Sequence, residues 1–164
     1  MNDLLTKLSS YNLFNFLFPG AIFVFATQRF GIFSLTTSNL LIDSFVIYFA
    51  GMTVSRVGSI VVEPLFRWLH IVNYAPYGDF LTASKIDPKI EVLLEINNTF
   101  RTVIALFLSI LAALLLYKVC VPSALARESG HLITYVAVSL LYVLSYRKQT
   151  DYIRKRVEHH KQAP

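Results

Sequence analysis

The sequence is short of charged residues and of cysteine. Only 15% of its 164 residues are Asp, Glu, Lys or Arg, whereas 55% are hydrophobic and the mean hydropathy is +0.54. Soluble domains usually carry about 25% charged residues, so an ordinary soluble domain is excluded. The single cysteine, Cys120, excludes an intrachain disulfide and indicates nothing about the redox compartment. The composition predicts an all-α membrane protein.

Long stretches of the chain contain almost no charge, and they define four apolar runs. A helix that spans a membrane needs about 20 apolar residues. We therefore predict four transmembrane helices in a single membrane domain, 1–164, with spans at about 10–29, 38–55, 102–121 and 129–146. A signal peptide cleaved after Ala26 is a competing interpretation of the first run, although its basic region would be Lys7 alone.

The orientation follows from the positions of lysine and arginine. Five of them lie in 56–101 and six in 147–161, whereas the loop 31–39 has none and the loop after the third span has Lys118 and Arg127. Loops rich in lysine and arginine stay in the cytoplasm. The pattern predicts a multi-pass protein of the bacterial inner membrane with both termini and the segment 56–101 in the cytoplasm.

The segment 56–101 is predicted to form a cytoplasmic helical hairpin that extends the second and third spans. Asp87 is a good N-cap, and Pro88 suits the first position of a helix that should run to Tyr117. A loop is expected over 73–87. Four residues of the second arm are expected to face four of the first: Ile90, Leu93, Leu94 and Asn97 against Ile60, Val61, Leu65 and Trp68. Alternatively, Trp68 lies at the headgroup level and its segment lies along the membrane surface.

Small residues form a stripe at the end of the second span. Gly51, Ser55 and Ser59 are spaced i, i+4 and i+8, and Gly58 widens the stripe. Small residues at this spacing let helix backbones approach closely. We therefore predict a helix-packing surface, against either another helix of the chain or a neighbouring subunit.

Polar residues at the predicted ends of the spans are candidates for membrane-interface positions. Asp43 is expected to pair with Arg29 at the outer surface, with a proton or ion site as the alternative. Arg56 is interpreted as the residue at which the second span leaves the bilayer. Asn97 and Asn98 are expected to form interhelical hydrogen bonds, with ligand binding as the alternative. The full set is Arg29, Asp43, Arg56, Glu63, Asn97, Asn98 and Arg101.

The C-terminal segment 147–160 is predicted to be a basic helix that continues the fourth span. Its basic residues are expected to face anionic lipid: Arg147, Lys148, Arg154, Lys155 and Arg156. Regular aromatic interleaving is absent, so nucleic-acid binding is not expected. Arg154 and His159 match the Arg-x4-His spacing of helical ribonucleases, but the match is short. No catalytic residue, metal site or cofactor is predicted.

Four phrases of the sequence carry a resemblance to a known group of proteins. "GMTVSRVGSIVVEP", "YAPYGDF", "KIEVLLEINNTFRT" and "LSYRKQTDYIRKR" resemble small bacterial multi-pass inner-membrane proteins associated with anti-phage defence and mobile loci. The resemblance implies a membrane protein with a role in defence and implies no catalytic residue.

Two functional hypotheses follow, and neither is an enzyme. In the first, the protein is a homo-oligomeric membrane effector or channel-like subunit with the small-residue stripe at its interface, triggered through the cytoplasmic hairpin. In the second, it is a non-catalytic anchor or sensor that recruits a cytoplasmic protein partner through 56–101.

Overall fold

The computed structural model describes residues 2–32, 34–37, 39–120 and 129–162, and these are helices and their connections, without a strand. The helices are α1 (Asn2–Arg29), α2 (Leu40–Val57), the π-helical turn η1 (Gly58–Val62), α3 (Glu63–Trp68), α4 (Tyr77–Ile86), α5 (Lys89–Cys120) and α6 (Ser129–Gln162). The predicted all-α class is confirmed. The predicted end of the third span, residue 121, lies outside the described residues.

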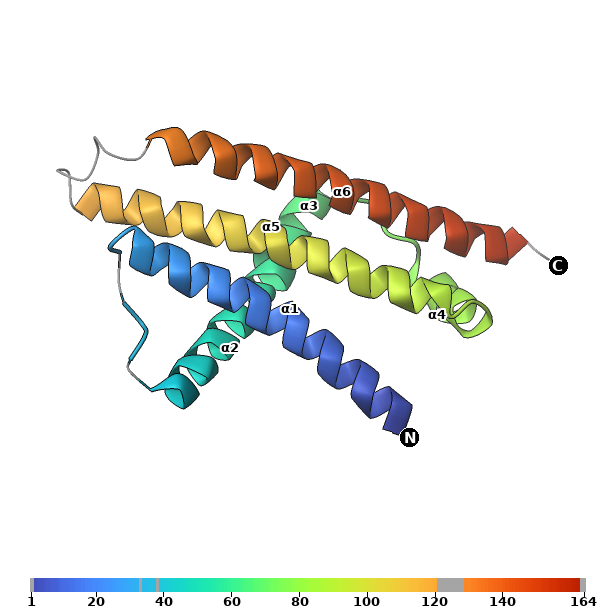
Figure 1. Ribbon diagram of the computed structural model, residues 1–164. Coiled ribbons are helices and arrows are strands. Elements are labelled where there is room, and N and C mark those ends of the chain that lie inside the picture. Colours follow the sequence, from blue (N-terminus) through green and yellow to red (C-terminus); the bar gives the residue numbers. More distant parts are fainter. Residues whose placement is uncertain (1, 33, 38, 121–128, 163–164) are drawn as a thin grey trace.

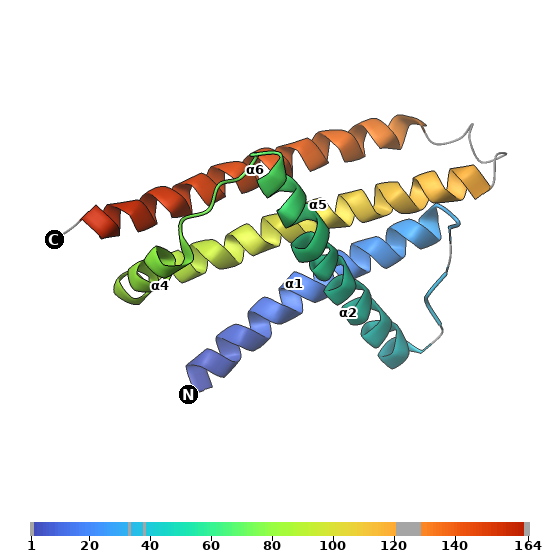
Figure 2. The ribbon, with the colours of Figure 1, turned by 180° about the vertical axis from the view of Figure 1, so that it is seen from behind.

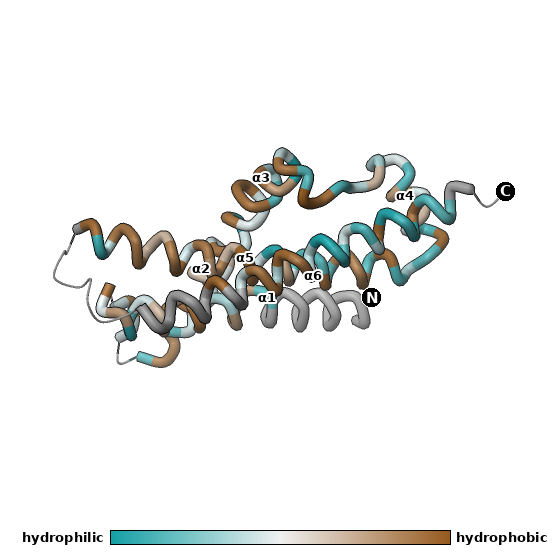
Figure 3. Tube along the Cα trace, turned by 90° about the horizontal axis from the view of Figure 1, so that it is seen from above, coloured by the Kyte–Doolittle hydropathy of each residue, from teal (hydrophilic) through white to brown (hydrophobic). Residues whose placement is uncertain are grey.

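The long helices α5 and α6 lie side by side and run in opposite directions (Figures 1 and 2). The start of α1, the end of α6 and the short helix α4 lie toward one end of the molecule, and the connection 30–39 lies toward the other. Helix α5 changes from polar to apolar along the chain and α6 from apolar to polar, so their polar halves lie next to each other near α4 (Figure 3).

Two described helices are long and apolar enough to cross a membrane. They are Leu40–Trp68, which comprises α2, η1 and α3, and Lys89–Val119 in α5; each contains an 18-residue stretch of high mean hydropathy, 1.7 in the first and 2.3 in the second. These lengths, 29 and 31 residues, exceed the roughly 20 residues that a span requires. Both properties are consistent with a membrane protein.

Helix α1 continues through Pro19 and crosses α2 at two glycines, Gly20 and Gly51. A Cβ atom on Gly20 would overlap the carbonyl oxygen of Ile47, and one on Gly51 would overlap that of Phe16. The absence of both side chains therefore lets the two backbones touch. This crossing explains why α1 and α2 are packed so closely along a short stretch.

The expected continuation of α2 beyond Arg56 is present, but it ends sooner and packs differently than predicted. The i→i−4 hydrogen bonds of the α-helix give way to an i→i−5 bond at η1, where the Glu63 N–H donates to the Gly58 carbonyl oxygen. Helix α3 ends at Trp68, and His70 has a φ of 55°, in the left-handed region that reverses the chain. The segment therefore turns back instead of projecting away from the bundle.

The residues predicted to join the two arms of the hairpin are wrong, although the arms do meet at Glu63 and Arg101. Ile60 and Trp68 are 70% and 75% exposed, whereas Ile90 and Asn97 are buried against α4 and α6. The C-terminal half of α6 thus packs against the face of α5 that was predicted to contact α3. The physical reason is that α6 offers its own apolar face there, with Ile153 and Val157 buried in the same cluster as Ile90 and Ala83.

The predicted loop 73–87 is shorter than expected because residues 77–86 form α4. Pro76 precedes the helix, and Asp79 lies in its first turn, where a carboxylate is favourable near the positive end of the helix dipole. Ala83 is buried, and Phe80 packs against the same cluster. Burial of this apolar face stabilises a helix of only ten residues. The helix predicted from Pro88 to Tyr117 agrees with α5.

The buried side chains form two clusters, one in each half of the molecule. The larger joins the apolar halves of α1, α2, α5 and α6 around Val54, Ile104, Leu106 and Tyr146. The smaller joins α4 to the polar halves of α5 and α6. The polar end of the molecule thus has a core of its own.

Candidate functional site

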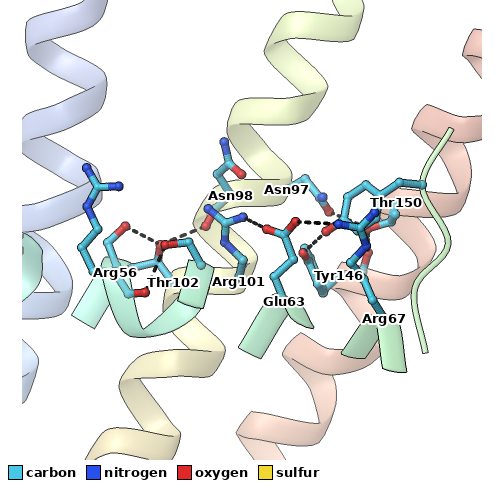
Figure 4. Close-up of polar contacts among 12 residues, drawn as sticks. Arg56, Glu63, Arg67, Asn97, Asn98, Arg101, Thr102, Tyr146 and Thr150 are labelled. Atoms are coloured by element: carbon cyan, nitrogen blue, oxygen red, sulfur yellow. Dashed lines mark hydrogen bonds and ion pairs between the residues drawn. The ribbon is translucent and has the colours of Figure 1, made fainter. Parts of the chain in front are cut away.

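The junction between the two halves is bridged by an ion pair from α3 to α5. Arg101 Nη1 contacts Glu63 Oε2, and the two side chains are only 16% and 23% exposed (Figure 4). Arg67, which is 60% exposed, lies 4.0 Å from the other oxygen of the same carboxylate. Arg101 Nε is buried and has no hydrogen-bond partner among the described residues. Because the pair is shielded from water, its loss would leave a poorly solvated charge.

A pair of tyrosine hydroxyls lies beside this ion pair. The hydroxyls of Tyr74 and Tyr146 hydrogen-bond to each other, and Tyr146 is fully buried. Burial and the neighbouring Tyr146 raise the pKa of Tyr74 far above its ordinary value, so its phenol is neutral. The Arg67 guanidinium lies 5.1 Å from the centre of the Tyr74 ring, a cation–π distance. These contacts hold the returning segment 69–76 against α6.

Asn97 provides the next polar contact between α5 and α6. Its Oδ1 accepts a hydrogen bond of 3.2 Å from the Thr150 hydroxyl, and both side chains are buried. One turn away, Gln149 Nε2 donates to the Leu93 carbonyl oxygen at 3.3 Å. The interhelical role predicted for Asn97 agrees with this geometry. Asn98 contributes its backbone carbonyl, which accepts from the Thr102 hydroxyl at 2.9 Å.

The small-residue stripe is used within the chain. Gly51 contacts α1, whereas Gly58 faces α5, where an added Cβ would lie 3.3 Å from the Arg101 carbonyl oxygen. Ser55 Oγ lies 3.3 Å from the Thr102 hydroxyl on α5, and the Ser59 hydroxyl donates to the Arg56 carbonyl oxygen. Of the two partners that the sequence left open, the structure shows a helix of the same chain.

An open cavity of about 590 Å³ lies between the segment 69–76, α4, α5 and α6. Its lining includes Glu63, Arg67, Tyr74, Tyr77, Asn97 and Arg154. Apolar side chains such as Phe80 and Leu94 complete the walls. The cavity combines aromatic surface with two guanidinium groups and a buried amide, which suits a partially charged ligand or the side chains of a partner.

Asp87 fastens the polar halves of α5 and α6 to each other. One carboxylate oxygen caps α5 by accepting from the Lys89 N–H at 3.1 Å, as predicted for this N-cap. The other accepts from Arg156 Nε and lies 3.2 Å from His160 Nε2. The Arg156 guanidinium is the main cause that lowers the pKa of Asp87 from 3.8 to about 2. The same contact raises the pKa of Arg156 above its ordinary value.

One expectation for charged residues needs correction, the ion pair between Arg29 and Asp43. Arg29 and Asp43 do not form the predicted ion pair among the residues that the structure describes. Instead, Asp43 Oδ1 accepts from the Thr37 N–H at 2.6 Å and its hydroxyl at 3.0 Å, because the segment before α2 folds back over the first turn. Arg29 and Arg56 are exposed, as is consistent with residues at the ends of apolar helices.

The basic residues of α6 are not equivalent. Arg147, Lys148 and Lys155 are exposed, as expected for lipid-facing residues. Arg156 pairs with Asp87, and Arg154 lies within 3.4 Å of Asp151 and 3.8 Å of Glu158. Arg154 and Arg156 therefore contact carboxylates of the protein, and the contact of the five basic residues with lipid stays a prediction.

Sequence reasoning missed Tyr74, Tyr146 and Thr150, and it treated Asp87 only as a cap. A signal for the α6 residues was present, since Tyr146, Thr150, Ile153 and Val157 recur at steps of four and three and so share one helix face. Within the described residues, no group of three or more His, Cys, Asp or Glu side chains could hold a metal ion. No protein-family model, curated protein or solved structure matches the chain.

Proposed function

We propose that the protein is a four-span protein of the bacterial inner membrane that holds a small helical unit at the cytoplasmic surface, where it binds a cytoplasmic partner. In this proposal both termini lie in the cytoplasm. The unit consists of α4, the first half of α5 and the second half of α6. A role in anti-phage defence follows from the resemblance of the sequence to small bacterial membrane proteins of that kind.

The observation that carries the proposal is the separate core at the polar end of the molecule. Ala83, Ile90, Ile153 and Val157 are buried there, away from the apolar halves of the long helices. The cavity lined by Arg67 and other polar residues opens at the same end. A segment that served only to connect two spans would need neither a core nor a cavity.

The alternative of an oligomeric effector or channel-like subunit receives less support. Its predicted interface was the stripe that includes Gly51 and Ser55, and these residues contact α1 and α5 of the same chain. A pore formed by several copies would therefore need a different interface. The anchor or sensor is the function that the geometry supports best.

The membrane topology is tested by cysteine labelling in a Cys120→Ser background. Single cysteines are introduced at three exposed positions: Ser34, Lys85 and Lys155. We expect a membrane-impermeant maleimide to label Ser34→Cys in intact spheroplasts, and to label Lys85→Cys and Lys155→Cys only after lysis. Labelling of Lys85→Cys and Lys155→Cys from opposite sides would overturn the proposal.

Partner binding is tested by quantitative co-purification of the full chain from its host. Tyr77→Ala and Arg67→Ala change exposed residues that line the cavity, and Ile86→Ala changes an exposed residue on the same helix α4 outside it. We expect the two cavity variants, but not Ile86→Ala, to lose the co-purifying protein while expression is unchanged. Equal recovery of the co-purifying protein with all three variants would show that the partner does not bind at the cavity.

A further inference from the structure

The outer face of η1 and α3 is apolar and uncovered. Five apolar side chains on this face are 42–75% exposed: Ile60, Val61, Leu65, Trp68 and Leu69. The opposite face is packed, because Val62 and Phe66 are buried against α5 and α6. An apolar surface of this extent marks a contact with another apolar phase or molecule.

This face continues an exposed apolar face of α2 along the same helix. Leu41, Phe45 and Phe49 are 69%, 70% and 65% exposed, and Ile60 follows after the exposed Arg56. In the proposed topology the face of α2 contacts lipid. The continuity of the two faces argues that the same phase, the bilayer, covers α3.

The length of the helix supports the same assignment. Leu40–Trp68 has 29 residues, which corresponds to about 43 Å at 1.5 Å per residue, whereas the hydrocarbon core is about 30 Å thick. The helix crosses α5 obliquely, as Figures 1 and 2 show from opposite sides. A tilted helix of this length reaches the headgroup region with its last turns instead of extending beyond it.

The packed face of α3 lies at the level at which the neighbouring helices leave their apolar runs. Glu63 contacts Arg101, which directly precedes the apolar run of α5. The ring centre of Phe66 lies 6.1 Å from that of Tyr146, which directly precedes the basic half of α6. The reversal at His70 then returns the chain over Tyr146. Tryptophan is enriched at this headgroup level in membrane proteins.

We infer that η1 and α3 lie in the headgroup region of the inner leaflet, with Ile60, Leu65 and Trp68 in contact with lipid. The inference rests on the proposed four-span topology. Arg56, exposed beside this face, is placed to contact lipid phosphates. The surface available to a cytoplasmic partner is then limited to α4, the cavity and the polar half of α6.

The test uses the single tryptophan of the chain, Trp68, as a native depth probe. The full chain is reconstituted in phosphatidylcholine–phosphatidylglycerol vesicles that carry bromine near the headgroup or near the acyl-chain ends, and iodide is the aqueous quencher. We expect blue-shifted emission and at least about twofold stronger quenching by shallow than by deep bromine, as for a residue at the headgroup–acyl boundary.

Two relocated probes calibrate the depth in a Trp68→Phe background. Phe49→Trp lies on the exposed face of α2 and should be quenched by deep bromine, whereas Ile86→Trp on α4 should be quenched by iodide alone. Quenching of Trp68 like that of Ile86→Trp would overturn the inference and leave α3 free for a protein partner. Protection of Trp68 from every quencher would also overturn it, in favour of contact with a second copy of the chain.

These outcomes are separate from the outcome for the proposed topology. If cysteine labelling supports four spans while Trp68 is quenched by iodide alone, only the placement of α3 fails. If labelling places Lys85 and Lys155 on opposite sides, the topology fails regardless of the fluorescence.

Discussion

The crossing of α1 and α2 makes a graded prediction for three glycines. A Cβ on Gly51 would lie only 2.6 Å from the Phe16 carbonyl carbon and 2.9 Å from the Gly20 nitrogen, both of them backbone atoms. The Phe16 carbonyl oxygen is nearer still, and ordinary contact begins at 3.4 Å, so the helices would have to separate by well over 0.8 Å. At Gly58 the corresponding distances are 3.3 Å and 3.4 Å, and at Gly78 no atom lies within 4 Å.

Gly51→Ala should therefore destabilise the protein by about 1–3 kcal/mol, the usual range for overpacking. Gly58→Ala should cost less because a shift of about 0.1 Å relieves it. Gly78→Ala should be neutral or stabilising by about 0.5–1 kcal/mol, since alanine favours the helix α4. With about 2–4 °C per kcal/mol for a chain of this size, the midpoint for Gly51→Ala should fall by roughly 2–12 °C.

The assay is thermal unfolding of the three variants in the same detergent, followed by circular dichroism at a helical wavelength. Gly78→Ala is the matched control, because it makes the same chemical change on a helix with open space around it. A midpoint for Gly51→Ala equal to that for Gly78→Ala would show that α1 does not touch α2 at this glycine.

Three further changes probe the polar junction. Glu63→Gln should destabilise by about 2 kcal/mol by leaving Arg101 without its carboxylate, and the added change Arg101→Gln should recover part of that loss in a double-mutant cycle. Tyr74→Phe should cost about 1 kcal/mol through the lost hydroxyl contact, measured by the same thermal assay. Because folding lowers the pKa of Asp87 to about 2, the contribution of this carboxylate to stability is complete above pH 3.8 and is lost as the pH falls toward about 2. Asp87→Asn should remove this acid dependence and speed tryptic cleavage of the α6 tail at neutral pH.

Local signals in the sequence were sufficient for the long helices. Asp87 and Pro88 predict the start of α5, and the structure shows the cap hydrogen bond and a helix that continues past Tyr117. The stripe at Gly51 correctly indicates close packing, because the backbone itself is the contact surface. The number of spans and their orientation stay predictions, which the cysteine labelling tests.

Long-range pairing was less accessible from the sequence. The first half of α5 was paired with α3 because these segments are neighbours in the chain, whereas Asn97 and Ile90 in fact meet Thr150 and the α6 residues near it. The tail of α6 was interpreted from its charge, which concealed its packed face. The contact of Gly20 with Gly51 was likewise inaccessible, since nothing local shows that the two glycines oppose each other.

The π-helical turn η1 inserts one additional residue into an otherwise regular helix. A regular helix advances by about 100° per residue, so the turn rotates everything that follows by about that angle relative to an uninterrupted helix. This rotation directs Glu63 toward Arg101 and turns Trp68 outward. A regular α-helix that kept all of these residues would carry Glu63 away from its partner and bring apolar side chains to the junction, whereas deleting Ser59 would restore a regular helix and leave Glu63 on the side of Arg101. The wide turn thus determines which side of α3 makes the polar contact with α5 and which side is exposed.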